Sequence, residues 1–347
     1  MATLYDVARA AGVSTATVSR VVHEQAGVRL ATRQRVLGVI EELGYVPDGA
    51  AQSMARHRKE VLGLVTIESR GPETEIEQGG LLFIEEVLRG VETALSPVGW
   101  SVLISVLRED SRPSALQQLR KVSAKVDGLL IAEGIVSSEE LASLAARTPV
   151  VLVAGSAAEP HADVVCADNR SGSIALARHL IERHGYRRLF YAAGPPEAPD
   201  ARERRSAFEE EVARHPGVTL TGCFQGRFAA IGGQRAVREI LGLPRPQWPD
   251  VIVCANDQMA IGAMLELQAA GIRVPADVAV AGFDDIHLGA ILTPSLTTVR
   301  QSMRHLGQRA CTLLLERIAD PSLPRRMERL PVELIVRESC GCPPAPW

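Results

Sequence analysis

The hydrophobic positions of the first 45 residues recur with helical spacing in three short stretches. The first stretch begins at Thr3, which can form a capping box with Asp6, and the glycine after this stretch permits a tight turn. The second follows a further capping residue, Ser14, and the third runs from Thr32 to Gly44. The inward-facing apolar residues are Leu4, Val7, Ala8, Val18, Val21, Val22, Val36, Ile40 and Leu43. Short helices joined by a glycine turn predict a helix-turn-helix unit at residues 1–46.

From residue 61 onward, apolar runs of strand length alternate with segments of helical length, such as 174–183 and 259–270. The runs are VLGLVTI, WSVLISVL, VDGLLIA, PVVLVAG, RRLFYAAG, DVIVCAND and DVAVAGFDD. Continuous apolar strands between helices indicate parallel sheets that are covered by helices on both faces. The segment is too long for one such layer, so we expect two α/β lobes joined by crossing strands near residues 165, 290 and 330.

These patterns divide the chain into four parts. The expected parts are a helix-turn-helix domain at 1–46, a hinge helix and linker at 47–60, a two-lobed core at 61–340 and a tail at 341–347. The expected lobes of the core comprise residues 61–165 plus 300–330 and residues 166–299 plus 331–340.

Charge is distributed unevenly along the chain. The whole sequence has 38 Lys and Arg against 41 Asp and Glu, a formal net charge of −3. Residues 1–60 hold 8 basic and 6 acidic residues, which leaves 30 and 35 for the remainder. A slightly basic module on an acidic body fits phosphate contact at one end only. The sequence shows neither a signal-peptide core nor a membrane-spanning apolar run, so we expect a cytoplasmic protein without membrane contact.

The six cysteines do not predict a metal site. They are scattered, apart from Cys340 and Cys342 near the C-terminus, and a lone C-x-C lacks the second pair of ligands that a zinc site needs. In a reducing cytoplasm, we interpret the thiols as small buried apolar groups.

Enzymatic motifs are also missing from the sequence. No G-x-S-x-G elbow, Walker A loop or paired-histidine metal motif occurs. The adjacent Asp284 and Asp285 would point to opposite faces of a strand, which argues against a catalytic pair. We therefore predict no catalytic residues and no cofactor.

The N-terminal run YDVARAAGVSTATVSRVVHEQAGVRLATRQRVLGVIEELGYVPDGAAQSMAR resembles the DNA-binding headpiece of the lactose-repressor (LacI/GalR) family. On its second helix the inward valines leave Thr15, Ala16, Thr17 and Arg20 exposed at the part of a recognition helix that reaches base edges. Arg20 can bond guanine bidentately, whereas Ala16 and the Thr15 methyl fit a thymine methyl. We expect Thr17 and Ser19 to contact phosphates.

The resemblance further implies a hinge helix near residues 50–56 that pairs with its twin in a homodimer and inserts a leucine into the minor groove. Met54 occupies that leucine position here and can act as the apolar wedge. A segment this short cannot form a stable helix alone, so the resemblance predicts that it becomes ordered only on double-stranded operator DNA.

Four later segments resemble the effector-binding core of the same family: AGPPEAPDARERRSAFEEEV, CANDQMAIGAM, VAGFDDIHLGAILTPSLTTVRQSMRHLGQ and LPVELIVRES. The family's core is similar to periplasmic sugar-binding proteins, with two parallel α/β lobes and a ligand between them. Position by position, the resemblance implies effector-binding roles for Arg204, Asp284, Asn256, Phe228 and Asp200. Asp257 and Asp285 are predicted to be helix-capping or structural neighbours.

The first loop of the core departs from the family pattern. It is longer and acidic, ESRGPETEIEQGGLLFIEEVLRGVE, and Phe83 lies nearest the position of the usual cleft aromatic. The Arg, Asn and Asp set still fits a sugar or sugar-like effector. The predicted function is therefore a DNA-binding transcriptional regulator, most simply a repressor. The alternative is a solute-binding receptor of the same core fold, which would need a signal peptide and would not begin with a recognition helix.

Overall fold

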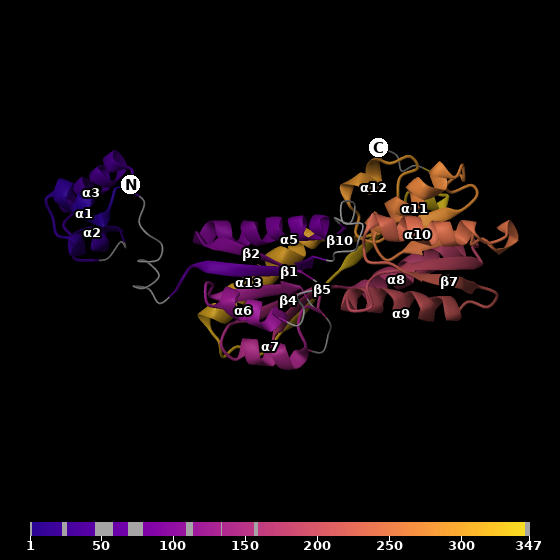
Figure 1. Cartoon of the computed structure of the whole chain (residues 1–347), viewed down its shortest axis with the longest axis horizontal. Helices are drawn as coiled ribbons and strands as arrows, with labels where there is room; N and C mark the ends of the chain where they lie inside the picture. Colours follow the sequence, from indigo (N-terminus) through magenta and orange to yellow (C-terminus); the bar gives the residue numbers. More distant parts are fainter. Residues whose placement is uncertain are drawn as a thin grey trace. The chain divides into compact units, whose positions relative to one another are not determined.

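The computed structural model describes residues 2–22, 26–45, 58–68, 79–108, 114–132, 134–155 and 159–343 (Figure 1). The chain divides into two compact units, Met1–Glu60 and Val61–Trp347. Met54 lies outside the described residues, as do residues 46–57 around it, so the expected hinge helix stays a prediction.

The first unit contains three helices in its described part: α1 (Leu4–Ala11), α2 (Thr15–Val22) and α3 (Leu30–Leu43). The capping box predicted between Thr3 and Asp6 is present, and Gly12 ends α1 in the left-handed conformation. Ser14 Oγ accepts a hydrogen bond from the Thr17 amide, as an N-cap does. A small core of Val7, Ala8, Ala11, Val18, Val21 and Val36 joins the helices. The structure confirms the helix-turn-helix unit.

One predicted boundary in this unit is wrong. The third helix begins at Leu30 instead of Thr32, after an extended Arg29 that forms no side-chain cap. Leu30 and Ala31 are strong helix formers, so the first turn forms ahead of the threonine that the capping pattern had selected.

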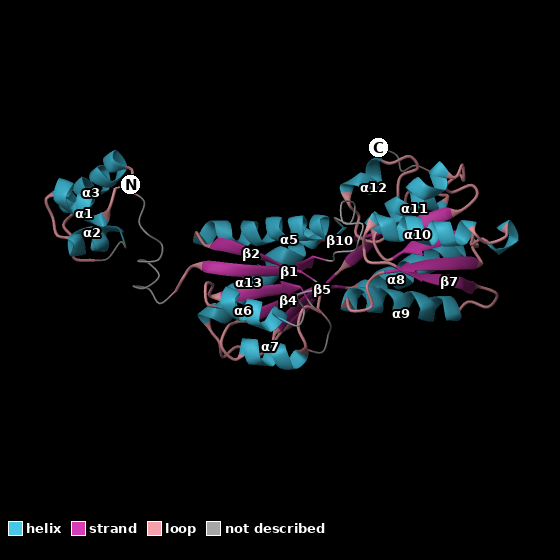
Figure 2. Cartoon of the chain, viewed as in Figure 1, coloured by secondary structure: helices cyan, strands magenta, loops and turns pink. Residues whose placement is uncertain are grey.

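The second unit contains two lobes, each built on a parallel sheet (Figure 2). The first lobe has a 6-stranded sheet with the order β11-β5-β4-β3-β1-β2. These strands are Met327–Leu330, Asp163–Ala167, Val150–Val153, Gly128–Ala132, Val61–Glu68 and Ser101–Arg108. Helices α5 (Gly79–Leu95) and α13 (Met303–Ala319) pack together on one face, whereas α6 (Ala115–Ser123) and α7 (Ser138–Ala145) cover the other.

The second lobe has a 4-stranded parallel sheet with the order β7-β6-β8-β9. The strands are Thr219–Gln225, Arg188–Ala193, Val251–Cys254 and Ala279–Ala281. Helices α8 (Asn169–Arg178) and α9 (Pro199–Ala213) pair on one face, and α10 (Ala230–Leu241) and α11 (Asp257–Ala269) pair on the other. A short helix, α12 (His287–Ile291), follows β9. Two parallel sheets with helices on both faces confirm the predicted fold class.

Three segments connect the lobes. The first follows β5 at Ala167, and the last lies at Pro331 between β11 and β12 (Val332–Ile335). The middle crossing lies at Ser302, between β10 (Thr298–Gln301) and α13, later than the crossing strand expected near residue 290 but close to the lobe boundary expected between residues 299 and 300. The chain crosses later than residue 290 because β10 still belongs to the second lobe, where it pairs antiparallel with β12.

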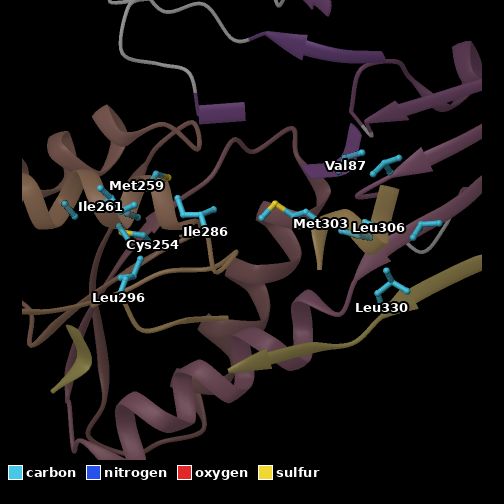
Figure 3. Close-up of a cluster of buried hydrophobic side chains, with 14 of the residues drawn as sticks. Val87, Cys254, Met259, Ile261, Ile286, Leu296, Met303, Leu306 and Leu330 are labelled. Carbon is cyan, nitrogen blue, oxygen red and sulfur yellow. The ribbon is translucent and has the colours of Figure 1, made fainter. Parts of the chain in front are cut away.

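Apolar packing connects the two lobes as well. One continuous cluster includes Val87, Met303 and Leu306 from the first lobe and Met259, Ile286 and Leu296 from the second (Figure 3). Among the described residues, no helix combines the length and the apolar character needed to cross a lipid bilayer.

Helices α5 and α13 cross at two glycines, which yields a testable prediction. A Cβ on Gly307 would overlap the backbone oxygen of Val87, and a Cβ on Gly90 would overlap the backbone oxygen of Arg304. Gly307→Ala should therefore lower the free energy of unfolding of the core by about 1–3 kcal/mol, although alanine is the better helix former.

The matched control is Gly38→Ala in α3, where an added Cβ meets no atom within 4 Å. That change should stabilise its own unit by up to about 1 kcal/mol. Calorimetric unfolding of both variants measures whether each substitution raises or lowers the free energy of unfolding. Stabilisation by Gly307→Ala would contradict the close approach of α5 and α13.

Candidate functional site

The first candidate site is the outer surface of α2. Ala16 and Arg20 are exposed and lie one helical turn apart, whereas Thr15, Thr17 and Ser19 are half-buried. The Thr17 hydroxyl lies 3.0 Å from Ser14 Oγ, so part of its hydrogen-bonding capacity is used at the helix start. One face of α2 thus presents a small apolar side chain on its first turn and a long cation on its last turn.

Four large apolar side chains in the described part of this unit are exposed, Tyr5, Leu30, Leu37 and Leu43, although Leu43 was expected to face inward. Tyr5 on α1 is 76% exposed and Leu30 at the start of α3 is 72% exposed. An aromatic residue with so much free surface is uncommon in a small folded unit, and its phenol can donate to an acceptor such as a phosphate. Helical periodicity alone placed Tyr5 outside the core but could not assign it a role.

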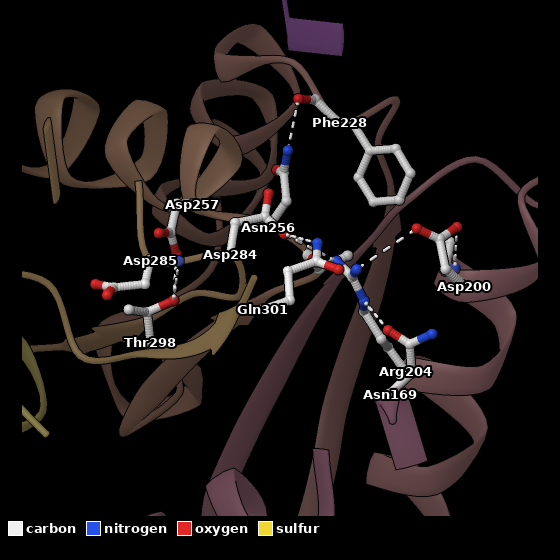
Figure 4. A network of polar contacts seen from close by, with 12 residues as sticks. Asn169, Asp200, Arg204, Phe228, Asn256, Asp257, Asp284, Asp285, Thr298 and Gln301 are labelled. Carbon is white, nitrogen blue, oxygen red and sulfur yellow. Dashed lines mark hydrogen bonds and ion pairs between the residues drawn. The ribbon is translucent and has the colours of Figure 1, made fainter. Parts of the chain in front are cut away.

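The second candidate site is centred on Arg204 in α9, a side chain that is only 2% exposed (Figure 4). Its Nε donates to Asn169 Oδ1 at 2.8 Å, and its Nη1 donates to the Ala255 backbone oxygen at 2.8 Å. The guanidinium also stacks 3.8 Å from the centre of the Phe283 ring. Three rigid contacts fix the orientation of the cation within the second lobe.

Two carboxylates flank this guanidinium at longer distances. Asp284 Oδ1 lies 3.4 Å from Arg204 Nη1, and Asp200 Oδ2 lies 3.5 Å from Nη2. Charge-assisted hydrogen bonds are normally about 2.7–2.9 Å long, so both carboxylates retain capacity for a closer donor. Asp200 is half-buried, whereas Asp284 is 7% exposed.

Asp284 also accepts a hydrogen bond from Gln301 Nε2 at 2.6 Å. Burial raises the pKa of Asp284 above the usual range of an aspartate, and the Arg204 guanidinium and the Gln301 amide oppose this shift. Its backbone has a φ of 128°, a region that non-glycine residues rarely adopt. The loop after β9 therefore holds Asp284 in a strained conformation against Arg204.

Asn256 and Phe228 form the upper part of the group in Figure 4. Asn256 is the N-cap of α11, where its Oδ1 accepts from the Met259 amide and its Nδ2 donates to the Phe228 backbone oxygen at 2.9 Å. Phe228 has a φ of 63°, and its ring centre lies 6.0 Å from the Arg204 guanidinium carbon. The asparagine thus secures the loop that carries the aromatic ring.

Asp257 and Asp285 have structural roles, as predicted. Asp257 is fully buried and accepts from Thr298 Oγ1 and from the Ile286 amide. Burial and the neighbouring Asp284 raise the pKa of Asp257. Asp285 forms ion pairs with Arg300 and Arg337.

The structure brings Arg204, Asp284, Asp200, Asn256 and Phe228 together in the second lobe, whereas Phe83 belongs to the first lobe and its effector-binding role stays a prediction. Phe83 lies half-buried on α5, packed against the apolar cluster that joins the lobes. A cavity of about 180 Å³ opens between the lobes beside the start of α9. Its lining includes Ile131 and Leu152 of the first lobe and Pro199 and Arg202 of the second.

Sequence reasoning missed three members of this site. They are Asn169, Gln301 and Phe283, which contact Arg204 or Asp284 directly. Asn169 is the second residue after the end of β5, as Asn256 is after β8, so the same signal could have identified it. Gln301 carried no such signal, because only the pairing of β10 in the second lobe brings it to Asp284.

Comparison with known proteins extends these observations. Residues 3–48 match the model of the bacterial regulatory proteins of the lacI family, and residues 177–340 match the periplasmic binding protein-like domain. The HTH-type transcriptional repressor PurR of Aliivibrio fischeri is 31% identical over 345 residues, which covers 98% of each chain. The ribose operon repressor of Escherichia coli is 31% identical over 343 residues, covering 98% of this chain and all of the relative.

Solved structures show the same likeness. The Lac repressor dimer bound to operator and the anti-inducer ONPF matches with a TM-score of 0.85 and 27% identity, over 98% of this chain and 99% of the other. The transcriptional regulator CelR in complex with cellobiose matches with a TM-score of 0.69 and 30% identity, over 98% and 100%. These relatives are transcriptional regulators along their whole length, which favours regulation over catalysis and over a solute receptor.

Proposed function

The chain belongs to the LacI family of bacterial regulatory proteins, and from that premise we propose that it binds a palindromic operator as a cytoplasmic homodimer controlled by a sugar or sugar-like effector at Arg204. The chain is a DNA-binding transcriptional repressor of this family, with an effector-binding domain. What the proposal adds is the operator's symmetry, the dimer and the chemistry of the effector.

The observation that supports the effector proposal most strongly is the incomplete pairing around Arg204. Asp284 and Asp200 lie 3.4 and 3.5 Å from the guanidinium, so each carboxylate can accept a shorter hydrogen bond from a ligand hydroxyl. Phe228 adds an aromatic face beside these polar groups, an arrangement that suits a sugar ring. The cellobiose complex of CelR is a relative with such a ligand.

The homodimer is supported by exposed apolar side chains on the first lobe. Leu82, Ile104 and Val106 are 41%, 44% and 52% exposed, and the last two lie on the edge strand β2. A single headpiece covers too few base pairs for specific recognition, whereas a twofold dimer reads two half-sites.

The DNA-binding proposal is tested with the full-length chain on palindromic and random duplexes. Fluorescence anisotropy should show preference for a palindromic operator, with an affinity that falls steeply as salt rises, since phosphate contacts release counterions. Equal affinity for both duplexes at physiological salt would contradict operator recognition. Size-exclusion chromatography with light scattering tests the dimer in the same samples.

The effector proposal predicts a separable effect of Asp200→Asn. Because Asp200 is half-buried and its ion pair with Arg204 is long, its loss should leave the melting temperature nearly unchanged but should weaken effector binding about tenfold or more. A thermal-shift screen of sugars and nucleosides identifies the ligand, and calorimetric titration then compares the variants.

The matched control is Glu209→Gln on the same helix, which removes an exposed carboxylate paired with Arg205. It should not change effector affinity. Wild-type affinity in Asp200→Asn would remove this residue from the proposed site while leaving the operator proposal intact.

A further inference from the structure

Four potential metal ligands lie close together where the C-terminal segment of the chain packs against the end of α8. None of them belongs to the polar group around Arg204. They are His179, His184, Cys340 and Cys342, and their ligand atoms all lie within 4.8 Å of one another. Cys340 is fully buried and the other three side chains are half-buried. The sequence reasoning rejected the C-x-C pair for want of a second pair, and the fold supplies that pair from a segment 161 residues earlier.

Four of the distances among these atoms are close to the edges of a tetrahedron around one ion. With Zn–N bonds of about 2.0–2.1 Å and Zn–S bonds of about 2.3 Å, two nitrogens lie about 3.3 Å apart and a nitrogen lies about 3.5 Å from a sulfur. In this cluster the two Nε2 atoms are 3.2 Å apart. The nitrogen–sulfur distances are 3.4 Å for His179–Cys340, 3.3 Å for His184–Cys342 and 3.8 Å for His179–Cys342.

The backbone departs from regular geometry on both sides of the cluster. Helix α8 continues into a π-helical segment, His179–Arg183, and π turns are rare and frequent at functional sites. Residues five apart on an α-helix point about 140° away from each other, whereas here the rings of His179 and His184 lie 4.9 Å apart. The wider turn thus brings both imidazoles to the same side.

The residue between the two cysteines is also constrained. Gly341 has a φ of 97°, and a Cβ there would lie 3.4 Å from Tyr186 Oη and 3.5 Å from His184 Nδ1. Glycine therefore permits the tight turn that directs both sulfurs toward the histidines.

Neighbouring groups position the four ligands. Tyr186 stacks on His184 with ring centres 5.4 Å apart, and its hydroxyl donates to the Cys340 backbone oxygen at 2.9 Å. Thr297 Oγ1 lies 3.1 Å from Cys340 Sγ, close enough to donate to a thiolate. Burial lowers the pKa of both His179 and His184.

We propose that His179, His184, Cys340 and Cys342 bind one zinc ion in a closed tetrahedral site that fastens the C-terminal segment to the second lobe. Four protein ligands leave no position for substrate water, so the site is structural and not catalytic. The two thiols bind as thiolates, and zinc uptake therefore releases their protons to solvent. Residues 338–342 are then held by the metal in addition to the hydrogen bonds of Glu338 and Ser339 to Ser295 and Thr297.

The test is the metal content of the full-length protein, purified under a non-chelating reductant after growth with added zinc. Mass spectrometry of the metal should give about one zinc ion per chain. Replacement by Co²⁺ should give the intense visible bands of a tetrahedral site and a thiolate-to-cobalt charge-transfer band. Cys342→Ser should weaken zinc affinity by at least about tenfold, because even the loss of an outer-shell partner of a ligand costs about 10–100-fold.

The matched control is Cys223→Ser, which removes another half-buried free cysteine, on β7, and should leave the zinc content unchanged. A chelator should lower the melting temperature of wild type and of Cys223→Ser but not that of Cys342→Ser. If Cys342→Ser does not fold, the cobalt titration of wild type decides by itself. Less than about a tenth of a metal ion per wild-type chain after zinc reconstitution, or a Cys340–Cys342 disulfide that persists under reductant, would overturn the proposal.

Discussion

Arg204→Met is expected to lower the free energy of unfolding of the core by about 3–5 kcal/mol, because it leaves Asp284 buried without its cation. The substitution also removes the hydrogen bonds to Asn169 and to the Ala255 backbone oxygen. Burial thus adds a stability role to the effector-binding role that the resemblance implies for Arg204. Denaturant unfolding, followed by circular dichroism, measures the change.

Two further variants show whether the uncompensated charge is the cause. Asp284→Asn in the Arg204→Met background should recover part of the lost stability, since a neutral amide tolerates burial better than a carboxylate. Arg205→Met removes the next arginine along α9, whose pair with Glu209 is exposed, and should cost at most about 1 kcal/mol. Equal costs at positions 204 and 205 would show that the buried network does not stabilise the lobe.

Arg20→Ala is expected to weaken binding to the palindromic operator by about 1–3 kcal/mol, or roughly 5–150-fold, while binding to random duplex falls much less. Arg20 is exposed in the last turn of α2, the helix expected to reach the major groove, and its guanidinium can bond guanine O6 and N7. The loss should be confined to one base pair of each half-site. Competition binding against operators with single base substitutions maps that position.

Arg9→Ala is the matched control for the loss of one positive charge. Arg9 is exposed on α1 and pairs with Asp6. Its removal should lower affinity for all duplexes by a similar small factor, because it changes only the general attraction to phosphate. An equal, sequence-independent loss in both variants would mean that Arg20 does not read a base.

The sequence by itself determined the headpiece and most of the parallel strands. The capping box of Thr3 and Asp6 and the turn at Gly12 depend on residues only a few positions apart, so a short window contains the whole signal. Each of the apolar runs found in the sequence corresponds to a strand, from β1 to β9. A strand covered on both faces must be apolar throughout, and this requirement is visible without the fold.

Tertiary structure alone decided the remaining strands and the partners of the site residues. β7, β10 and β12 are missing from the sequence prediction because they mix polar with apolar positions, whereas β5 and β11 were expected only as crossing strands near residues 165 and 330. Arg204 could be proposed as a site residue from its position in the sequence. Its contacts with Asn169 and Asp284, however, join residues that lie 35 and 80 positions apart in the chain. The second pair of ligands for Cys340 and Cys342 lies further away still. Helix caps, turns and the periodicity of buried positions depend on residues that are neighbours in the sequence. The contacts between distant residues depend on the order of the strands and on where the chain crosses between the lobes, and no short stretch of sequence contains that information.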